Sequence, residues 1–303
     1  MPQVHTIIKV FFRLALLFLL LIFLLHPLMV RAEEDIGTAA PYIPKTGTNI
    51  LKSASTSVDI SHTDQGYMMC RYTRTSDKVI VQVKKDGSER TYKHYLKTDG
   101  TYEAISFTEG DGLYHVSIWE RVTGKQYSKA LSIQVKVSLT DPYLPFLYAS
   151  ARVNFTGESA CVQKGMELTR GAVTTPEKID AVYRFITEHI RFDKELAANV
   201  SAGYKSDSYR TLSEEKGICL DYASLAAAML RSQGVPVKVV FGTNPYGEYH
   251  AWICVYIDEA GTVGTRTVKA GTWLRLDPTF DATTTQGQTK PWTKGEYIPE
   301  FIH

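Results

Sequence analysis

The segment Lys216-Gly217-Ile218-Cys219-Leu220-Asp221-Tyr222-Ala223 decides the fold, because it places a cysteine at the start of a predicted helix. Strong helix formers, mostly alanines with Met229 and Leu230, fill the run that follows. Gly234-Val235-Pro236 ends this run. We therefore expect Cys219 in or next to the first helical turn. Unpaired backbone amides and the helix dipole at this position favour a thiolate and could hold an oxyanion.

A histidine follows on a predicted strand. Residues 237–241 read as one strand, and residues 248–257 alternate between two faces as a second. His250, Trp252, Cys254 and Tyr256 share one of these faces. Because His250 comes soon after the turn between the two strands, we expect its side chain to face a cleft.

A carboxylate ends the next predicted strand. Asp277 follows the apolar stretch 272–276, and Pro278 cannot continue the hydrogen-bonded ladder. An aspartate at such a position could accept the imidazole N–H of His250 and hold the useful tautomer. The sequence thus offers a nucleophile, a base and an orienting acid in the chain order Cys219, His250, Asp277.

Each of these residues also has an ordinary structural interpretation. A lone cysteine is usually a small buried residue, a lone histidine is usually hydrogen-bonded in the core, and an aspartate before proline commonly caps a turn. All three interpretations would have to hold within one short helix–strand–strand unit. The pattern therefore favours acyl-transfer chemistry through Cys219.

The four motifs Gly-Ile-Cys219-Leu-Asp-Tyr-Ala, Gly-Val-Pro-Val-Lys-Val-Val-Phe-Gly, Tyr-His250-Ala-Trp and Leu-Arg-Leu-Asp277-Pro-Thr-Phe together resemble the transglutaminase-like superfamily, especially its secreted bacterial members. The resemblance extends from about Ile179 to Phe280. It implies a papain-like α+β core, in which the helix carrying the cysteine packs on an antiparallel sheet. It also implies the roles of nucleophile for Cys219, base for His250 and orienting acid for Asp277. The superfamily includes cross-linking enzymes, peptidases, deamidases and inactive members, so the reaction stays open.

The expected reaction begins when the Cys219 thiolate attacks a glutamine carboxamide or a peptide bond. A lysine amine would resolve the resulting thioester to a cross-link, whereas water would give deamidation or hydrolysis. Tyr204 and Tyr209 are candidate oxyanion donors. Trp252 and Trp273 are candidate walls of the acyl site, with packing in the sheet as an equal alternative. Asp221 is explained by its favourable charge at a helix start.

The N-terminus predicts export. Lys9 and Arg13 precede the apolar run Leu14–Leu25, and Val30-Arg31-Ala32 offers a cleavage site for signal peptidase. We therefore interpret residues 1–32 as a signal peptide, and a retained anchor is the minor alternative because the run is short for a membrane span. The protein is expected to be secreted or held at the cell surface, and to act on a protein or peptide substrate such as a cell-wall protein.

Charge and cysteine usage exclude several function classes. The net charge is +2, and residues 1–32 carry three cations and no acid, so about −1 remains for the mature chain. This balance gives no basic stripe for nucleic acid. No paired Cys or His motif supports zinc, and we expect no metal and no cofactor. Cys70 and Cys161 could form a disulfide or stay unpaired in the core, whereas Cys254 is expected in the core.

Two domains are predicted after a linker over residues 33–50. Short alternating runs over residues 51–140, separated by Asp-Gly and Thr-Gly pairs, indicate an all-β sandwich of immunoglobulin-like type. We interpret its tyrosines as framework rather than as a binding surface. Residues 141–303 form the predicted catalytic domain, with helices starting near Ala160 and Thr175. The polar segment from Phe192 to Arg210 is expected to form a substrate groove or a lid.

Overall fold

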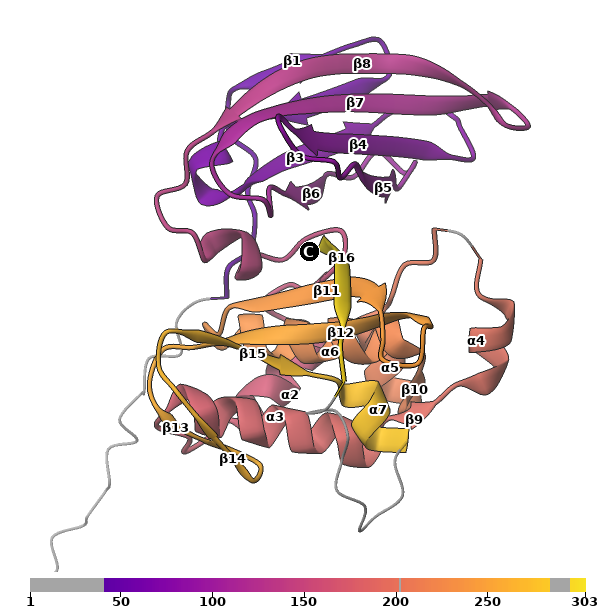
Figure 1. Ribbon diagram of the computed structural model, residues 1–303. Coiled ribbons are helices and arrows are strands. Elements are labelled where there is room, and N and C mark those ends of the chain that lie inside the picture. The colour runs from indigo at the N-terminus through magenta and orange to yellow at the C-terminus, as the bar shows by residue number, and fades with distance from the viewer. Residues whose placement is uncertain (1–40, 202, 284–294) are drawn as a thin grey trace, which may run out of the picture. The chain divides into compact units, whose positions relative to one another are not determined.

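The N-terminal half of the protein is built from two antiparallel four-stranded sheets, as the computed structural model shows (Figure 1). The structure describes residues 41–201, 203–283 and 295–303. The first sheet consists, in spatial order, of β1 (Ile50–Lys52), β2 (Thr56–Asp59), β3 (Tyr67–Tyr72) and β6 (Glu103–Ser106). The second consists of β5 (Tyr92–Leu96), β4 (Val79–Lys85), β7 (Gly112–Thr123) and β8 (Gln126–Val137).

Alternation along strands such as β4 helps to explain why these sheets pack face to face. In β4, Val79, Val81 and Val83 are buried, whereas the two residues between them are half-buried. The buried set continues through both sheets and forms one apolar cluster. Gly124 has a φ of 53°, which allows the two-residue turn between β7 and β8. The arrangement confirms a β-sandwich, while its immunoglobulin-like type stays a prediction.

The C-terminal domain mixes helices with a third antiparallel sheet. Its strands lie in the order β15 (Thr272–Leu276), β12 (Tyr249–Ile257), β11 (Val237–Thr243) and β16 (Ile298–Ile302). The helices are α2 (Ala160–Leu168), α3 (Thr175–His189), α4 (Lys194–Asn199), α5 (Ser208–Glu214), α6 (Cys219–Arg231) and α7 (Pro278–Thr283). This architecture confirms the predicted α+β core.

Short elements connect these parts. They are two single 3-10 turns, η1 (Thr63–Gln65) and η2 (Leu144–Phe146), the parallel pair β9 (Arg191–Phe192) and β10 (Lys216–Gly217), and the hairpin β13 (Gly261–Val263) and β14 (Arg266–Val268). The described end of the expected linker contacts both domains, since Gly47 N–H donates to Asp59 and Ala149 N–H donates to the Tyr42 carbonyl. The predicted signal peptide lies outside the described residues. Within the described ranges, no helix is long and apolar enough to cross a membrane.

Helix α6 is the centre of the C-terminal domain. Every residue after Cys219 is buried, so the helix has no solvent face. It contacts α2, α3, α5 and α7 as well as strands β11 and β12. Close approach of α2 is possible because its Gly165 lies against Met229, where an added Cβ would be 3.0 Å from the backbone oxygen.

The edge strand β16 was not expected from the sequence. It pairs with β11 across an irregularity between Phe241 and Gly242. At Gly242 the backbones approach so closely that an added Cβ would lie 2.0 Å from the Ile298 carbonyl oxygen. The strand β16 can therefore dock only because residue 242 lacks a side chain.

We predict that Gly242→Ala displaces β16 and lowers the free energy of unfolding by about 1–3 kcal/mol, as overpacking does elsewhere. Urea unfolding of the full chain measures this loss. The matched control is Gly157→Ala, where the nearest atom to an added Cβ is Pro41 Cγ at 4.0 Å. Equal stability of the two variants would contradict the close approach.

Candidate functional site

Cys219 is the first residue of α6 and is only partly buried. The Asp221 side chain folds back and accepts a hydrogen bond from the Ile218 N–H at 2.9 Å. Gly217 permits this, since an added Cβ there would lie 2.5 Å from Asp221 Cβ. As the first helical residue, Cys219 has a backbone N–H without an intrahelical acceptor. Its sulfur and its amide therefore both remain at the helix start, where a reacting carbonyl could meet them.

The structure brings together the three residues that the sequence singles out. His250, near the start of β12, has its Nε2 2.9 Å from Asp277 Oδ2. The Cys219 side chain lies near the same imidazole, since both residues line one cavity and Cys219 contributes to the raised pKa of His250. The sulfur and the imidazole thus share a cavity wall, and the carboxylate holds the imidazole.

These contacts determine the charge of the histidine. Burial alone lowers the pKa of His250, but the hydrogen bonds and charges of Asp277 and Cys219 outweigh burial and raise its pKa to about 10. The imidazolium is therefore favoured at neutral pH. A protonated imidazole next to a nucleophile can give its proton to a leaving amine.

Asp277 has two structural tasks. Its Oδ1 accepts the Phe280 N–H at 3.0 Å, so it caps α7, whose first residue is Pro278. Its Oδ2 accepts from His250 and also from the Tyr297 hydroxyl at 2.9 Å. The turn-capping interpretation and the catalytic interpretation are thus compatible, because the two oxygens are used separately.

Tyr297 is a residue that sequence reasoning missed. It is 9% exposed. The centre of its ring lies 4.9 Å from that of Trp252 and 4.0 Å from the guanidinium carbon of Arg275. Its only signal in the sequence was a tyrosine in a short stretch near the C-terminus, which no spacing rule connects to Asp277. We interpret it as a positioning residue for the carboxylate.

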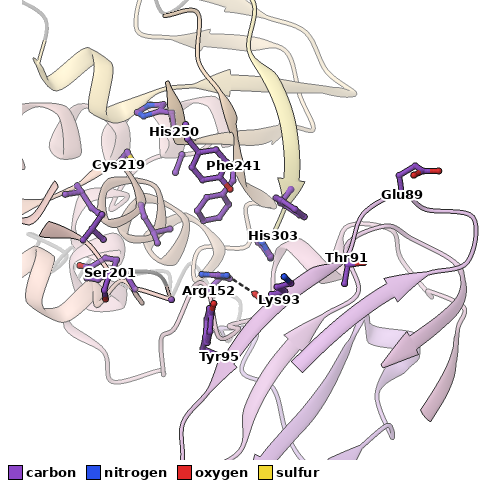
Figure 2. A pocket seen from close by; sticks show the side chains of 18 residues that line it. Glu89, Thr91, Lys93, Tyr95, Arg152, Ser201, Cys219, Phe241, His250 and His303 are labelled. Carbon is purple, nitrogen blue, oxygen red and sulfur yellow. Dashed lines mark hydrogen bonds between the residues drawn. The ribbon is translucent and has the colours of Figure 1, made fainter. Parts of the chain in front are cut away.

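A cavity of about 680 Å³ opens beside Cys219 and His250 (Figure 2). The C-terminal domain supplies most of its wall, including Tyr204, Phe241, Tyr249 and His303. The sandwich supplies Glu89, Thr91, Lys93 and Tyr95. Such a volume lies within the usual range of ligand pockets. A peptide side chain or a short peptide segment could therefore reach the sulfur.

The two tyrosines proposed as oxyanion donors behave differently. Tyr204 lines the cavity, but its hydroxyl donates to Asp221 at 2.8 Å and accepts from Arg210. These bonds occupy its proton, so an oxyanion role would require a rearrangement. Tyr209 is 68% exposed and lines a different cavity.

The two tryptophans pack within the sheet rather than in the wall of this cavity. Trp252 is 2% exposed and clusters with Val240 and Tyr297. The ring centres of Trp273 and Phe146 are 5.5 Å apart, and the Lys238 ammonium lies 3.7 Å from the centre of the Trp273 ring. Packing, the alternative that the sequence left open, accounts for both side chains.

All four cysteines are free thiols. Cys70 and Cys161 are buried in different apolar clusters, so the disulfide alternative is not realised. Burial raises the pKa of Cys161 and of Cys254 to about 11, and raises that of Cys70 further. Of the four, Cys219 is the cysteine that lines the cavity. In the part of the chain that the structure describes, no group of three or more metal-ligating side chains is found.

Comparison with known proteins agrees with this fold. Residues 163–278 match the family model of the transglutaminase-like superfamily. The matched range includes Cys219, His250 and Asp277. No curated protein matches the chain. The resemblance seen in the motifs is confirmed, and the C-terminal domain has a transglutaminase-like core.

Several solved structures are similar to the chain. A candidate cysteine protease from Cytophaga hutchinsonii is 15% identical, with a TM-score of 0.37 over 84% of this chain and 74% of that one. A TGase is 23% identical, with a TM-score of 0.34 over 47% of this chain and 38% of that one. The transglutaminase of red sea bream is 10% identical, with a TM-score of 0.31 over 70% of this chain and 47% of that one.

We predict that Asp277→Asn lowers the pKa of His250 from about 10, because it removes the carboxylate that stabilises the imidazolium. The protonated ring then persists over a narrower pH range and is lost at lower pH. Nitrogen chemical shifts of the imidazole, followed by NMR during a pH titration, measure this change. Asp99→Asn is the control, since this exposed carboxylate contacts Thr101 and not the histidine. An unchanged titration of His250 in Asp277→Asn would contradict the assigned contact.

Proposed function

We propose that the protein is a thiol acyl-transfer enzyme that acts on glutamine carboxamides or peptide bonds of proteins through a thioester on Cys219. The observation that carries this proposal is that Cys219 and His250 line one peptide-sized cavity while His250 is hydrogen-bonded to Asp277. The match of residues 163–278 to the transglutaminase-like superfamily supports chemistry of this general class.

The proposed reaction proceeds in two stages. In the first, the Cys219 thiolate attacks the carbonyl carbon, and the Cys219 N–H at the helix start helps to hold the oxyanion. The His250 imidazolium gives its proton to the departing amine, and the thioester remains. In the second, the neutral imidazole takes a proton from the incoming amine or water, which attacks the thioester and releases the sulfur. Asp277 keeps the ring oriented throughout.

We also propose that the enzyme works outside the cytoplasm, on a protein or peptide of the cell surface or cell wall. The features that support this are the charged and apolar pattern of residues 1–32 and their small residues at 30 and 32. Export of a fusion of these residues to a reporter, compared with the same fusion lacking the Leu14–Leu25 run, tests the proposal. Retention of both fusions inside the cell would contradict it.

We predict that the protein transfers a labelled primary amine to a glutamine-containing donor protein, and that Cys219→Ala lowers the rate by a factor of about 10³ or more, because the nucleophile is lost. Label incorporation measures transfer, while ammonia or new chain termini measure hydrolysis. Cys254→Ala is the matched control, since this thiol lies in another cluster. Product formation of either kind that survives in Cys219→Ala would contradict the thioester.

A non-catalytic binding module is the alternative from another class, and thiol labelling separates the two. We predict that iodoacetamide modifies Cys219 of the folded protein at neutral pH and that His250→Ala slows this by about tenfold or more, because fewer thiolates form without the imidazolium. Mass spectrometry of the modified peptide gives the rate. Cys70 and Cys161, which are buried, should react only after unfolding. A Cys219 that stays inert, with or without His250, would favour the binding module.

A further inference from the structure

Arg152 is a cation in the wall of the same cavity, and neither the proposed reaction nor the sequence motifs use it (Figure 2). The residue lies in the segment between η2 and α2. Its backbone is fixed at both ends, since its N–H donates to Ser150 Oγ and its carbonyl accepts from Ser224 Oγ of the buried helix α6. Its side chain therefore projects from an anchored position.

The hydrogen bonding of Arg152 is incomplete. Its Nη2 donates to the Lys93 carbonyl at 3.0 Å, and its guanidinium lies 5.6 Å from the centre of the Phe241 ring. Its Nε is buried without a hydrogen-bond partner. Among the described residues, no carboxylate forms an ion pair with it. Since buried charges are normally paired, a guanidinium in this state is suited to receive an anion.

Cations outnumber acids among the residues that line the cavity with Arg152. Lys93 of the sandwich adds a second, exposed cation to the wall. His303 is buried nearby, and its pKa is lowered by burial and by Arg152, so it stays neutral. The acid in the cavity wall is Glu89, which is exposed on the sandwich side. This part of the cavity is therefore positive.

The cation and the sulfur open onto the same cavity, since Arg152, Tyr249 and Cys219 all line it. A peptide that fills this cavity with its carbonyl at the sulfur could therefore present a neighbouring group to the guanidinium.

We propose that Arg152 binds a carboxylate of the acyl donor next to the reacting carbonyl, either an acidic side chain or a free C-terminal carboxylate. This inference rests on the proposed function and names its substrate class. A guanidinium suits the task because its planar fork can donate two parallel hydrogen bonds to one carboxylate. Arg152 is thus a specificity residue rather than a catalytic one.

The test measures binding without turnover, using the full chain with Cys219→Ala. The probes are fluorescent peptides with the core Ala-Ala-Gln-Ala-Ala and blocked ends, in which each alanine in turn is replaced by Asp or by Asn. A second set carries a free C-terminal carboxylate in place of the terminal amide. Fluorescence anisotropy gives the affinity of each. Arg152→Gln and Arg152→Lys are compared with Arg170→Gln, which changes an exposed arginine outside the cavity wall.

We expect at least one Asp peptide, or the free-acid peptide, to bind about tenfold or more tightly than its uncharged counterpart, as suits a charge-assisted contact. Arg152→Gln should abolish this preference, and Arg152→Lys should keep only part of it, while Arg170→Gln leaves it unchanged. The set that shows the preference identifies the source of the carboxylate. A purely structural role would instead weaken charged and uncharged peptides equally.

The inference is overturned if every charged peptide binds with the same affinity as its uncharged counterpart, or if neither binds. It is also overturned if a preference for the charged peptide survives in Arg152→Gln. These outcomes are independent of the proposed chemistry, because Cys219 is absent from the binding experiment. Failure of the amine-transfer and hydrolysis assays with the unmodified protein would instead count against the acyl-transfer function alone.

Discussion

The burial of helix α6 is the constraint on which the rest of the site depends. A helix enclosed on all sides packs tightly, and its run Ala226–Ala228 combines with larger buried side chains such as Tyr222 to fill the surrounding space. Its far end is held by Arg231, which is fully buried and donates to the carbonyls of Val237, Tyr148 and His303. Burial lowers the pKa of Arg231 to about 9, so it remains charged at neutral pH and links the helix to β11 and β16. Cys219, the first residue of a helix that is held at its far end, therefore has little freedom to move.

The second half of the site is fixed by the way in which strands β12 and β15 end. These strands pair from Ile253 with Leu276 to Ile257 with Thr272, so His250 and Asp277 lie beyond the paired region at the same end. There the carboxylate caps α7 and accepts from both the imidazole and Tyr297. One aspartate thus joins a helix start, a strand end and a buried tyrosine. The position of the imidazole is therefore set by the ends of β12 and β15 and by the start of α7.

Local patterns allowed the sequence to predict much of this arrangement. The helix that starts at Cys219 and the strand that carries His250 follow from residue periodicity and from glycine and proline at the boundaries. Strand β16 did not follow, because Ile298-Pro299-Glu300-Phe301-Ile302 shows little alternation and is ordered by a partner strand far away in sequence. The directions of side chains were equally hidden: Trp252 follows His250 on the same face, yet packs on Tyr297 away from the cavity wall. Arg152 belongs to no sequence motif. Only the tertiary structure shows that no described carboxylate forms an ion pair with its guanidinium.

The sandwich contributes to the site rather than merely preceding it. Strand β5 places Lys93 and Tyr95 in the cavity wall, and the Lys93 carbonyl holds the Arg152 guanidinium. The half-buried pair of Lys205 with Glu103, 2.7 Å apart, joins the segment before α5 to the strand β6. A change in the sandwich would therefore alter the cavity wall without touching the hydrogen bond between His250 and Asp277. The cavity wall therefore draws on both parts of the chain, whereas Cys219, His250 and Asp277 all belong to the C-terminal part.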